Sequence, residues 1–246
     1  MNDELDHVRE AHLEPDFLAC WRASRSGDAD AFRGLVRERA PGVFAVRVTT
    51  LEWCRRFLLE IDARRDAALR TGRTLRPPNS MHEHGALLVD LGLDGAARDL
   101  ARTWLPPLAA RLFPEHGGAT LDDHHAYLVE YARELDHDLG FHVDDSDVTF
   151  NLCLGDDFAG AELRMLGLRC DLHRQTDVLP HEVLEIEHEP GVAILHAGRH
   201  RHAVAEIASG RRRNLILWCR SSAVCAAREG PLRCEPWCGW PGPRAE

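Results

Sequence analysis

The chain has 246 residues, of which 44% are hydrophobic and 28% are charged, so a packed globular domain is expected rather than a disordered chain. Its 40 acidic residues outnumber its 30 basic ones and give a formal charge of −10, which disfavours nucleic acid or an anionic membrane as the main partner. The sequence contains no lysine, which excludes chemistry that needs a lysine amine, such as a Schiff base.

The start of the sequence has neither a basic leader nor an apolar run, and no stretch reaches the roughly 18 apolar residues of a membrane span. We therefore expect a cytoplasmic protein and leave its oligomeric state open. The 8 cysteines are then expected to be thiols or metal ligands rather than disulfides.

The first half of the chain has mostly helical patterns. Residues 43–48 suggest an early strand, and residues 51–69 carry apolar residues at steps of three and four, which predicts a helix. Thr49 and Glu52 have the spacing of a capping box before it, and Gly72 is a plausible stop. A second helical stretch covers residues 96–112 and is divided by Pro106-Pro107.

The second half changes to the period of β-strands. Short apolar segments at residues 148–154, 183–186, 192–195 and 214–218 are separated by Gly, Pro and Asp turns. This pattern predicts a mainly β fold of the sandwich or jelly-roll type supported by N-terminal helices. We divide the chain into a helical support region at 1–120, a β core at 121–222 and a Cys/Trp/Pro-rich tail at 223–246, all in one structural unit.

His142 and Asp144 form the first candidate site. Residues two apart in a strand point to the same face, so the imidazole and the carboxylate would stand side by side. One more histidine would complete the two-histidine, one-carboxylate triad of non-haem Fe(II) oxygenases. In a chain with 15 histidines the pair also arises by chance, and a surface hydrogen-bonded pair would explain it equally well.

The third ligand is sought among His196, His200 and His202, which would share a face in an unbroken strand. Ten residues separate His202 from Arg212, which fits two adjacent antiparallel strands joined at Gly210. An arginine there would form a bidentate pair with the distal carboxylate of a 2-oxo diacid. The register favours His202, and strand alternation puts Arg212 on the face opposite to its two arginine neighbours.

On these residues the chain resembles the 2-oxoglutarate/Fe(II) oxygenases of the prolyl and lysyl (procollagen) hydroxylase type. The resemblance is greatest to the iron- and 2-oxoglutarate-dependent oxygenase domain-containing group, and it covers roughly residues 43–240. It implies a double-stranded β-helix (jelly-roll or cupin-like) barrel, an iron site of His142, Asp144 and His202, and Arg212 as the cosubstrate anchor. It also implies Fe(II), 2-oxoglutarate and O2 as cofactor and cosubstrates, with ascorbate as an auxiliary reductant.

Further site residues follow from the same resemblance. Tyr131 is expected to hydrogen-bond the cosubstrate carboxylate, against the alternative of a core tyrosine with a satisfied hydroxyl. Asn151 and Arg164 would contact substrate if their strands have the expected phase. Gly160-Ala161 stands where paired glycines are usual, and we expect it to narrow the substrate entrance.

The C-terminal cysteines are a second candidate metal site. Cys219, Cys225, Cys234 and Cys238 could surround zinc, but only the second pair has the close spacing usual for zinc ligands. A structural zinc is therefore the less favoured interpretation, and reduced thiols in a tail packed on the barrel are favoured. The acidic and histidine clusters at residues 122–125 and 136–138 are expected to be polar loops.

The leading functional hypothesis is hydroxylation of an unactivated C–H bond, with release of succinate and CO2. The substrate is expected to be a prolyl- or lysyl-type residue in a peptide or a related amino acid. Asp144 argues against the halogenating relatives, which lack that carboxylate. The alternatives are a tailoring oxygenase on a small metabolite, a non-catalytic jelly-roll binding module, and a cupin-type enzyme without an oxo-acid cosubstrate, against which Arg212 speaks.

Overall fold

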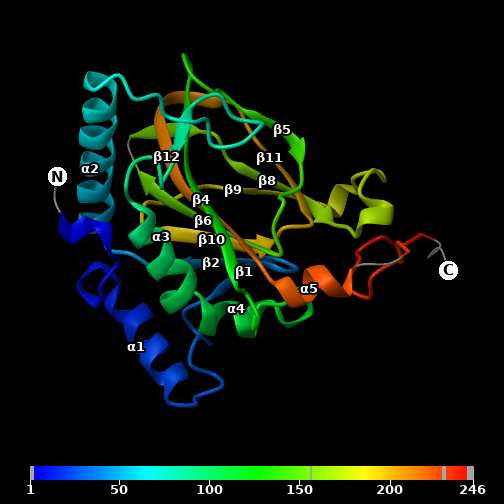
Figure 1. Ribbon diagram of the computed structural model, residues 1–246. Coiled ribbons are helices and arrows are strands. Elements are labelled where there is room, and N and C mark those ends of the chain that lie inside the picture. Colours follow the sequence, from blue (N-terminus) through cyan, green and yellow to red (C-terminus); the bar gives the residue numbers. More distant parts are fainter. Residues whose placement is uncertain (1–2, 156, 229–230, 243–246) are drawn as a thin grey trace.

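The computed structural model describes residues 3–155, 157–228 and 231–242, and strands dominate these ranges (Figure 1). The strands are β1 (Arg37–Ala40), β2 (Val43–Arg47), β3 (Gly85–Leu87), β4 (Asp123–Ala132), β5 (Leu139–His142), β6 (Val148–Gly155), β7 (Phe158–Gly160), β8 (Leu163–Leu168), β9 (Val183–Ile186), β10 (Val192–Ala197), β11 (His200–Val204) and β12 (Ile207–Arg220). The helices are α1 (Pro15–Arg25), α2 (Leu51–Arg70), α3 (Asp94–Asp99), α4 (Pro106–Leu112) and α5 (Ser222–Ala227).

The strands form two antiparallel sheets that face each other. The larger sheet has the order β1-β2-β10-β6-β12-β4-β3, with β7 also paired to β12. The smaller sheet has the order β5-β11-β8-β9. Side chains of both sheets, among them Ile194 and Ile216 from the larger and Met165 and Ile186 from the smaller, form one buried cluster between them. The packing is therefore sheet on sheet, as the sequence predicted.

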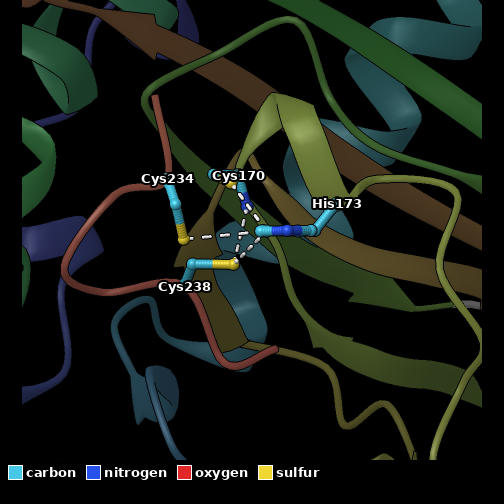
Figure 2. A group of neighbouring side chains, drawn as sticks. All are labelled: Cys170, His173, Cys234 and Cys238. Atoms are coloured by element: carbon cyan, nitrogen blue, oxygen red, sulfur yellow. Dashed lines mark hydrogen bonds between the residues drawn. The ribbon is translucent and has the colours of Figure 1, made fainter. Parts of the chain in front are cut away.

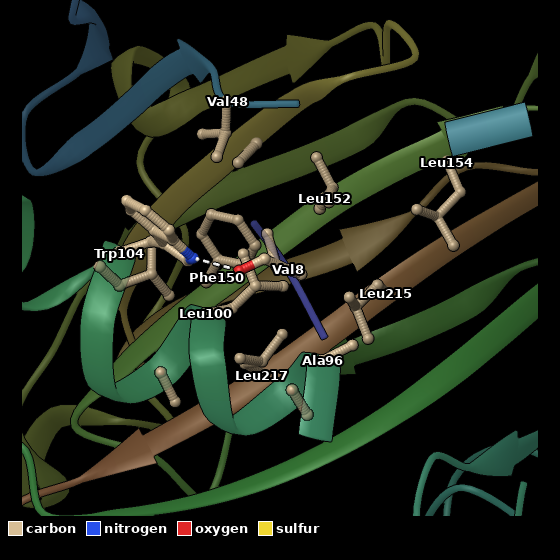
Figure 3. Close-up of a cluster of buried hydrophobic side chains, with 14 of the residues drawn as sticks. Val8, Val48, Ala96, Leu100, Trp104, Phe150, Leu152, Leu154, Leu215 and Leu217 are labelled. Carbon is tan, nitrogen blue, oxygen red and sulfur yellow. Dashed lines mark hydrogen bonds between the residues drawn. The ribbon is translucent and has the colours of Figure 1, made fainter. Parts of the chain in front are cut away.

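The outer face of the larger sheet is covered by the N-terminal helices. Figure 3 shows part of the buried hydrophobic cluster between this face and the helices, in which side chains of strands β6 and β12 contact the helical segment around Leu100 and Trp104. The Trp104 indole donates a hydrogen bond to the Val8 carbonyl oxygen at 3.0 Å, which ties the N-terminal segment to this layer. The helices thus support the larger sheet on its outer face, and its inner face is left for the site.

Strand alternation assigns each side chain of β6 to one of these two faces. Phe150 and Leu152 point outward into the helix-covered core, whereas Thr149 and Asn151 line a cavity between the sheets. The alternation predicted for residues 148–154 is confirmed. It also explains why β6 is buried on both faces, a pattern typical of a strand in the middle of a layered fold.

The helix predicted at residues 51–69 is present as α2, but its N-cap differs from the prediction. Thr50, not Thr49, caps the helix, and its hydroxyl accepts from the Trp53 backbone N–H at 3.2 Å. The Thr49 hydroxyl lies instead 3.2 Å from the Cys54 thiol. The sequence offered two adjacent threonines, and the cap belongs to the one whose oxygen reaches the N3 amide.

The stretch predicted as a helix at residues 96–112 is divided at its prolines, as expected. It consists of α3, a π-helical segment at Leu100–Trp104, and α4, which begins at Pro106. Proline fits the first turn of α4 because its missing N–H would have no partner there in any case. No helix among the described residues has the length and apolar character that crossing a membrane requires.

The predicted pairing of the strands that carry His202 and Arg212 was wrong. β11 pairs with β5 and β8 in the smaller sheet, whereas β12 pairs with β4, β6 and β7. Gly210 is not the turn between them but lies within β12, where its φ of 75° brings a backbone position close to the Asp157 carbonyl. His202 and Arg212 therefore approach the same cavity from opposite sheets.

We expect protonation of the buried His116 to lower the unfolding free energy in acid. Burial lowers the pKa of His116 to about 4, from the usual value of 6.5. Because the unfolded chain binds the proton first, stability is full above about pH 6.5 and falls as the pH decreases toward the folded pKa. We expect His116 to account for about 2 kcal/mol of the loss in unfolding free energy between about pH 7 and about pH 5.

Urea unfolding of the wild type and of His116→Gln at both pH values measures this contribution. The unfolding free energy of the variant should change less between the two pH values than that of the wild type, whatever the absolute stability of the variant. Equal differences in the two proteins would show that His116 is not held neutral by burial.

Candidate active site

His142, Asp144 and His202 converge between the two sheets. His142 ends strand β5 and lies directly opposite His202 of β11 in the antiparallel pair. Asp144 Oδ1 lies 3.7 Å from His142 Nε2 and 3.5 Å from His202 Nε2. Asp144 itself is beyond the strand, contrary to the predicted His-x-Asp strand, and the bond from its backbone N–H to the Gly198 carbonyl at 2.9 Å holds it in place.

Both imidazoles are oriented by backbone carbonyl groups. His142 Nδ1 donates to the Gly140 oxygen at 2.8 Å, and His202 Nδ1 donates to the His200 oxygen at 2.8 Å. This leaves the lone pair of each Nε2 directed toward the shared centre, as in metal sites where the second ring nitrogen fixes the tautomer. Burial lowers the pKa of both rings, that of His142 to about 4, so both are neutral and able to bind a metal at neutral pH.

The Asp144 carboxylate is buried, with 4% of its surface exposed. Burial raises the pKa of Asp144, but attraction to the protonated forms of His202, His196 and His142 and the hydrogen bond from Thr149 lower it more, so the net pKa is below the usual value. Its second oxygen, Oδ2, accepts a hydrogen bond from the Thr149 hydroxyl at 2.5 Å. The group therefore stays ionised, and Oδ1 is the oxygen left for a metal.

Thr149 gives a test of this orientation that leaves all three ligand residues in place. We expect Thr149→Val to weaken Fe(II) binding about 10- to 100-fold, because groups that hydrogen-bond a metal ligand contribute on that scale. Thr149→Ser keeps the hydroxyl and should restore most of the affinity. Anaerobic Fe(II) titration measures both, and equal affinities for valine and serine would exclude the orienting role.

The other two candidates for the distal histidine lie beside the three-residue group. The three histidines do not lie on one unbroken strand: the chain turns after Ala197, so His196 belongs to β10 and His200 begins β11. His196 Nε2 is 3.9 Å from Asp144 Oδ2, the oxygen already bonded to Thr149. Only His142, Asp144 and His202 form a metal-compatible group here among the described residues.

Arg212 is a buried cation on the inner face of β12. Its exposed fraction is 1%, its guanidinium lies 4.5 Å over the Tyr131 ring, and its Nη1 donates to the Ala161 carbonyl. Within the described ranges no carboxylate forms an ion pair with it, and its Nε has no hydrogen-bond partner. A buried charge without a counterion is costly, so this group is suited to binding an anion.

The neighbouring arginines point to the other face of the strand. Arg211 forms an ion pair with Glu130, and Arg213 forms one with Asp62 at 2.6 Å. The alternation used to choose Arg212 among three consecutive arginines is therefore confirmed. Ala161, which accepts from Arg212, has a φ of 56°, so the position beside Gly160 has the left-handed conformation that favours glycine.

Tyr131 lies in the same cavity, with its hydroxyl 2.8 Å from His82 Nε2. Burial raises the pKa of Tyr131 above its usual value, and burial lowers the pKa of His82 to about 4. Tyr131 therefore stays a protonated donor beside Arg212. Sequence reasoning missed His82; the local signal was Asn79, three residues earlier, whose Oδ1 lies 3.0 Å from His82 Nδ1.

The cavity shared by these groups is small, about 30 Å³. Its lining comprises His82, Tyr127, Val129, Tyr131, Leu139, His142, Asp144, Thr149, Asn151, Leu163, His196, His202, Val204, Arg212 and Ile216. Asn151 is thus inside as predicted, whereas Arg164 is not, because it pairs with Glu185 on the surface.

The donor set fits Fe(II). Two neutral imidazoles and one carboxylate on one side of a centre are the protein ligands of non-haem iron oxygenases. The buried cation at the same cavity fits the carboxylate of an oxo-acid cosubstrate. The site therefore provides for both a metal and an anionic ligand.

Comparison with known proteins supports the same class. Residues 1–118 match the OGFOD2-like domain. The 2-oxoglutarate and iron-dependent oxygenase domain-containing protein ICU11 of Arabidopsis thaliana is 41% identical over 225 residues, which are 92% of this chain and 56% of that protein. The 2-oxoglutarate and iron-dependent oxygenase domain-containing protein 2 of Mus musculus is 36% identical over 234 residues, which are 93% of this chain and 64% of the mouse protein.

Solved structures show the fold. A prolyl 4-hydroxylase from Phytophthora capsici superposes with a TM-score of 0.56 at 14% identity, covering 93% of this chain and 73% of that one. AviO1 from Streptomyces viridochromogenes superposes with a TM-score of 0.54 at 17% identity, covering 81% and 96%. The predicted double-stranded β-helix is confirmed.

The fold and the site thus resemble those of 2-oxoglutarate- and iron-dependent oxygenases, the class that the sequence predicted. More narrowly, the chain is a homologue of the 2-oxoglutarate and iron-dependent oxygenase domain-containing proteins, with the OGFOD2-like domain in its first 118 residues. It spans 56% to 64% of the length of these two curated relatives.

Proposed function

We propose that the protein hydroxylates an unactivated C–H bond in a reaction that consumes 2-oxoglutarate and O2. His142, Asp144 and His202 would hold Fe(II), and Arg212 together with Tyr131 would bind the distal carboxylate of 2-oxoglutarate. The observation that carries the proposal is the buried Arg212, which has no ion-pair partner in the described chain and lines the same cavity as the three metal-compatible residues. A metal site alone would not require this cation.

When bound, iron and 2-oxoglutarate supply the oxidation of the C–H bond by O2, with succinate and CO2 as co-products. The chain's own residues position the metal ligands and exclude water. The carbonyls of Gly140 and His200 fix the imidazoles, and Thr149 fixes the carboxylate. The buried walls keep water away from the reacting centre, which strengthens the electrostatic attraction of Arg212 for a carboxylate.

For the substrate we propose a prolyl- or lysyl-type residue of a peptide, or a related amino acid. Two similar folds are described as prolyl hydroxylases, and one of them, from Trichoplax adhaerens, is in complex with a peptide fragment of a hypoxia-inducible factor, with a TM-score of 0.52. The small cavity favours the second candidate, a small metabolite.

The experiment has two steps. Anaerobic titration with Fe(II) and 2-oxoglutarate should produce a metal-to-ligand charge-transfer band, which appears only if both bind at one centre. Succinate release is then measured with proline- and lysine-containing peptide pools and, separately, with pooled metabolites. Stimulation by peptides supports the proposed substrate, and stimulation by metabolites alone supports the second candidate.

Absence of the charge-transfer band in the folded wild-type protein would overturn the proposal and favour a non-catalytic jelly-roll module.

The proposal also includes the division into a support region at 1–120, a β core at 121–222 and a tail at 223–246. It is supported by the way helices α2 to α4 cover the outer face of the larger sheet.

A further inference from the structure

A second group of metal-binding side chains lies outside the candidate active site. Cys170 and His173 stand on the short turn that follows strand β8, and Cys234 and Cys238 stand in the C-terminal tail. Figure 2 shows the four side chains pointing toward one another from these two segments. Sixty residues of chain lie between His173 and Cys234, and the tail runs beside the turn in Figure 1.

The distances within the group are those of a tetrahedral site. His173 Nδ1 lies 3.3 Å from Cys170 Sγ, 3.7 Å from Cys234 Sγ and 3.4 Å from Cys238 Sγ. All four ligand atoms lie within 4.8 Å of one another. Zinc bonds of about 2.3 Å to sulfur and about 2.0 Å to nitrogen give S···N edges of about 3.6 Å in a tetrahedron.

We propose that Cys170, His173, Cys234 and Cys238 bind a structural zinc ion that fastens the C-terminal tail to the barrel. The ligand spacing supports this, because two residues separate the first pair and three separate the second, as in zinc sites built from local turns. Three thiolates with one imidazole select zinc over hard cations. Four protein ligands also leave no open position, which is the arrangement of a structural site.

The surroundings hold the ligands in place. The Cys170 backbone N–H donates to Cys238 Sγ at 3.5 Å, and the Gly239 N–H donates to the Leu168 carbonyl at 3.0 Å. The Trp240 ring stacks on His173, and the Arg169 guanidinium lies 5.5 Å over Trp240. These contacts orient sulfur and nitrogen in the way that outer-shell partners orient the ligands of known metal sites.

A disulfide explains the group less well. Cys170, Cys234 and Cys238 are all unbridged thiols in the structure. A bridge between any two of them would leave the third thiol without a role, and it would not account for one imidazole nitrogen facing three sulfurs. The zinc set considered from sequence also fails, because Cys219 is buried in β12 and Cys225 is exposed on α5, apart from this group.

The zinc site would shape a large cavity. Trp237 and Gly239, on either side of Cys238, line a cavity of about 680 Å³ that shares no lining residue with the cavity of the iron ligands. The Trp237 ring packs against the His116 ring at 4.7 Å. Without the metal the tail would lose its strongest link to β8, and this wall of the cavity would loosen.

The test is metal analysis of the full-length protein. We expect zinc in equal molar amount to the chain after exhaustive removal of loosely bound iron. Cys170→Ser and Cys238→Ser should each lose most of the zinc, whereas the matched control Cys225→Ser should keep it. His142→Ala should also keep it, which separates this site from the iron site and from the proposed oxygenase function.

A second measurement does not depend on the folding of variants. Co(II) added to the metal-free wild type should give the intense visible bands of a tetrahedral site and a thiolate charge-transfer band, and Zn²⁺ should abolish both. Zinc content unchanged in Cys170→Ser and Cys238→Ser would overturn the proposal. So would a wild-type protein with no zinc, no thiolate–cobalt band and a disulfide among these cysteines in its peptide mass map.

Discussion

Asp144→Ala and His202→Ala are each expected to reduce 2-oxoglutarate turnover to the level of a protein-free control. Each substitution removes one of three protein ligands, and Asp144 also neutralises charge at the centre. Alanine at 144 leaves His142, His196 and His202 around a pocket without its only described carboxylate. Succinate formation with saturating Fe(II) and 2-oxoglutarate measures the loss.

His200→Asn is the matched control for this experiment. His200 is a buried histidine two positions before His202 on the same strand, and its Nδ1 contacts only the Arg201 carbonyl, at 3.3 Å. It should keep most of the activity, because it is outside the group that can hold the metal. Full turnover by the His202→Ala protein, or equal loss in the His200 variant, would mean that the distal ligand is assigned to the wrong histidine.

The sequence predicted the site better than it predicted the strands that build it. Side-chain alternation is a local property, so it placed Thr149 and Asn151 on one face of β6 and separated Arg212 from Arg211 and Arg213. The ten-residue spacing from His202 to Arg212 rested on a wrong strand pairing, yet it selected two residues that line the same cavity. The two strands are not neighbours in one sheet but face each other across the barrel.

What the sequence did not reveal depends on contacts between distant segments. His82 reaches Tyr131 only because β3 pairs with β4 and brings residues 79–85 to the cavity. The turn at Cys170 and His173 meets Cys234 and Cys238 only after the barrel has formed. The close spacing of the second cysteine pair was visible, but its partners were sought among nearby cysteines, whereas the tertiary structure supplies them from the turn after β8.

Arg212→Met is expected to change 2-oxoglutarate binding and protein stability in opposite directions. Loss of the guanidinium should raise the apparent KM for 2-oxoglutarate at least about 30-fold, because truncating one partner of a buried charge pair costs about 2 kcal/mol or more. Without 2-oxoglutarate, the variant should be more stable than the wild type by about 1 kcal/mol or more. It replaces a buried cation that has no described ion-pair partner with an apolar chain of similar length.

Arg211→Met is the control because it changes the neighbouring residue with the opposite surroundings. Arg211 is paired with the buried Glu130, so its loss should lower the unfolding free energy while the KM for 2-oxoglutarate stays unchanged. Arg212→Lys keeps the charge without the planar fork and should fall between the wild type and Arg212→Met in KM. Steady-state succinate assays and urea unfolding of the ligand-free proteins measure both quantities.

The opposite signs are what distinguish an anchor from a structural arginine. If Arg212 only supported the fold through the Tyr131 ring and the Ala161 carbonyl, Arg212→Met would lose stability and leave the KM nearly unchanged. An unpaired buried arginine lowers the stability of the ligand-free protein, and a ligand whose carboxylate pairs with that arginine offsets this loss when it binds. With Zn²⁺ present throughout in place of iron, the further addition of 2-oxoglutarate should therefore raise the melting temperature of the wild type but not that of Arg212→Met.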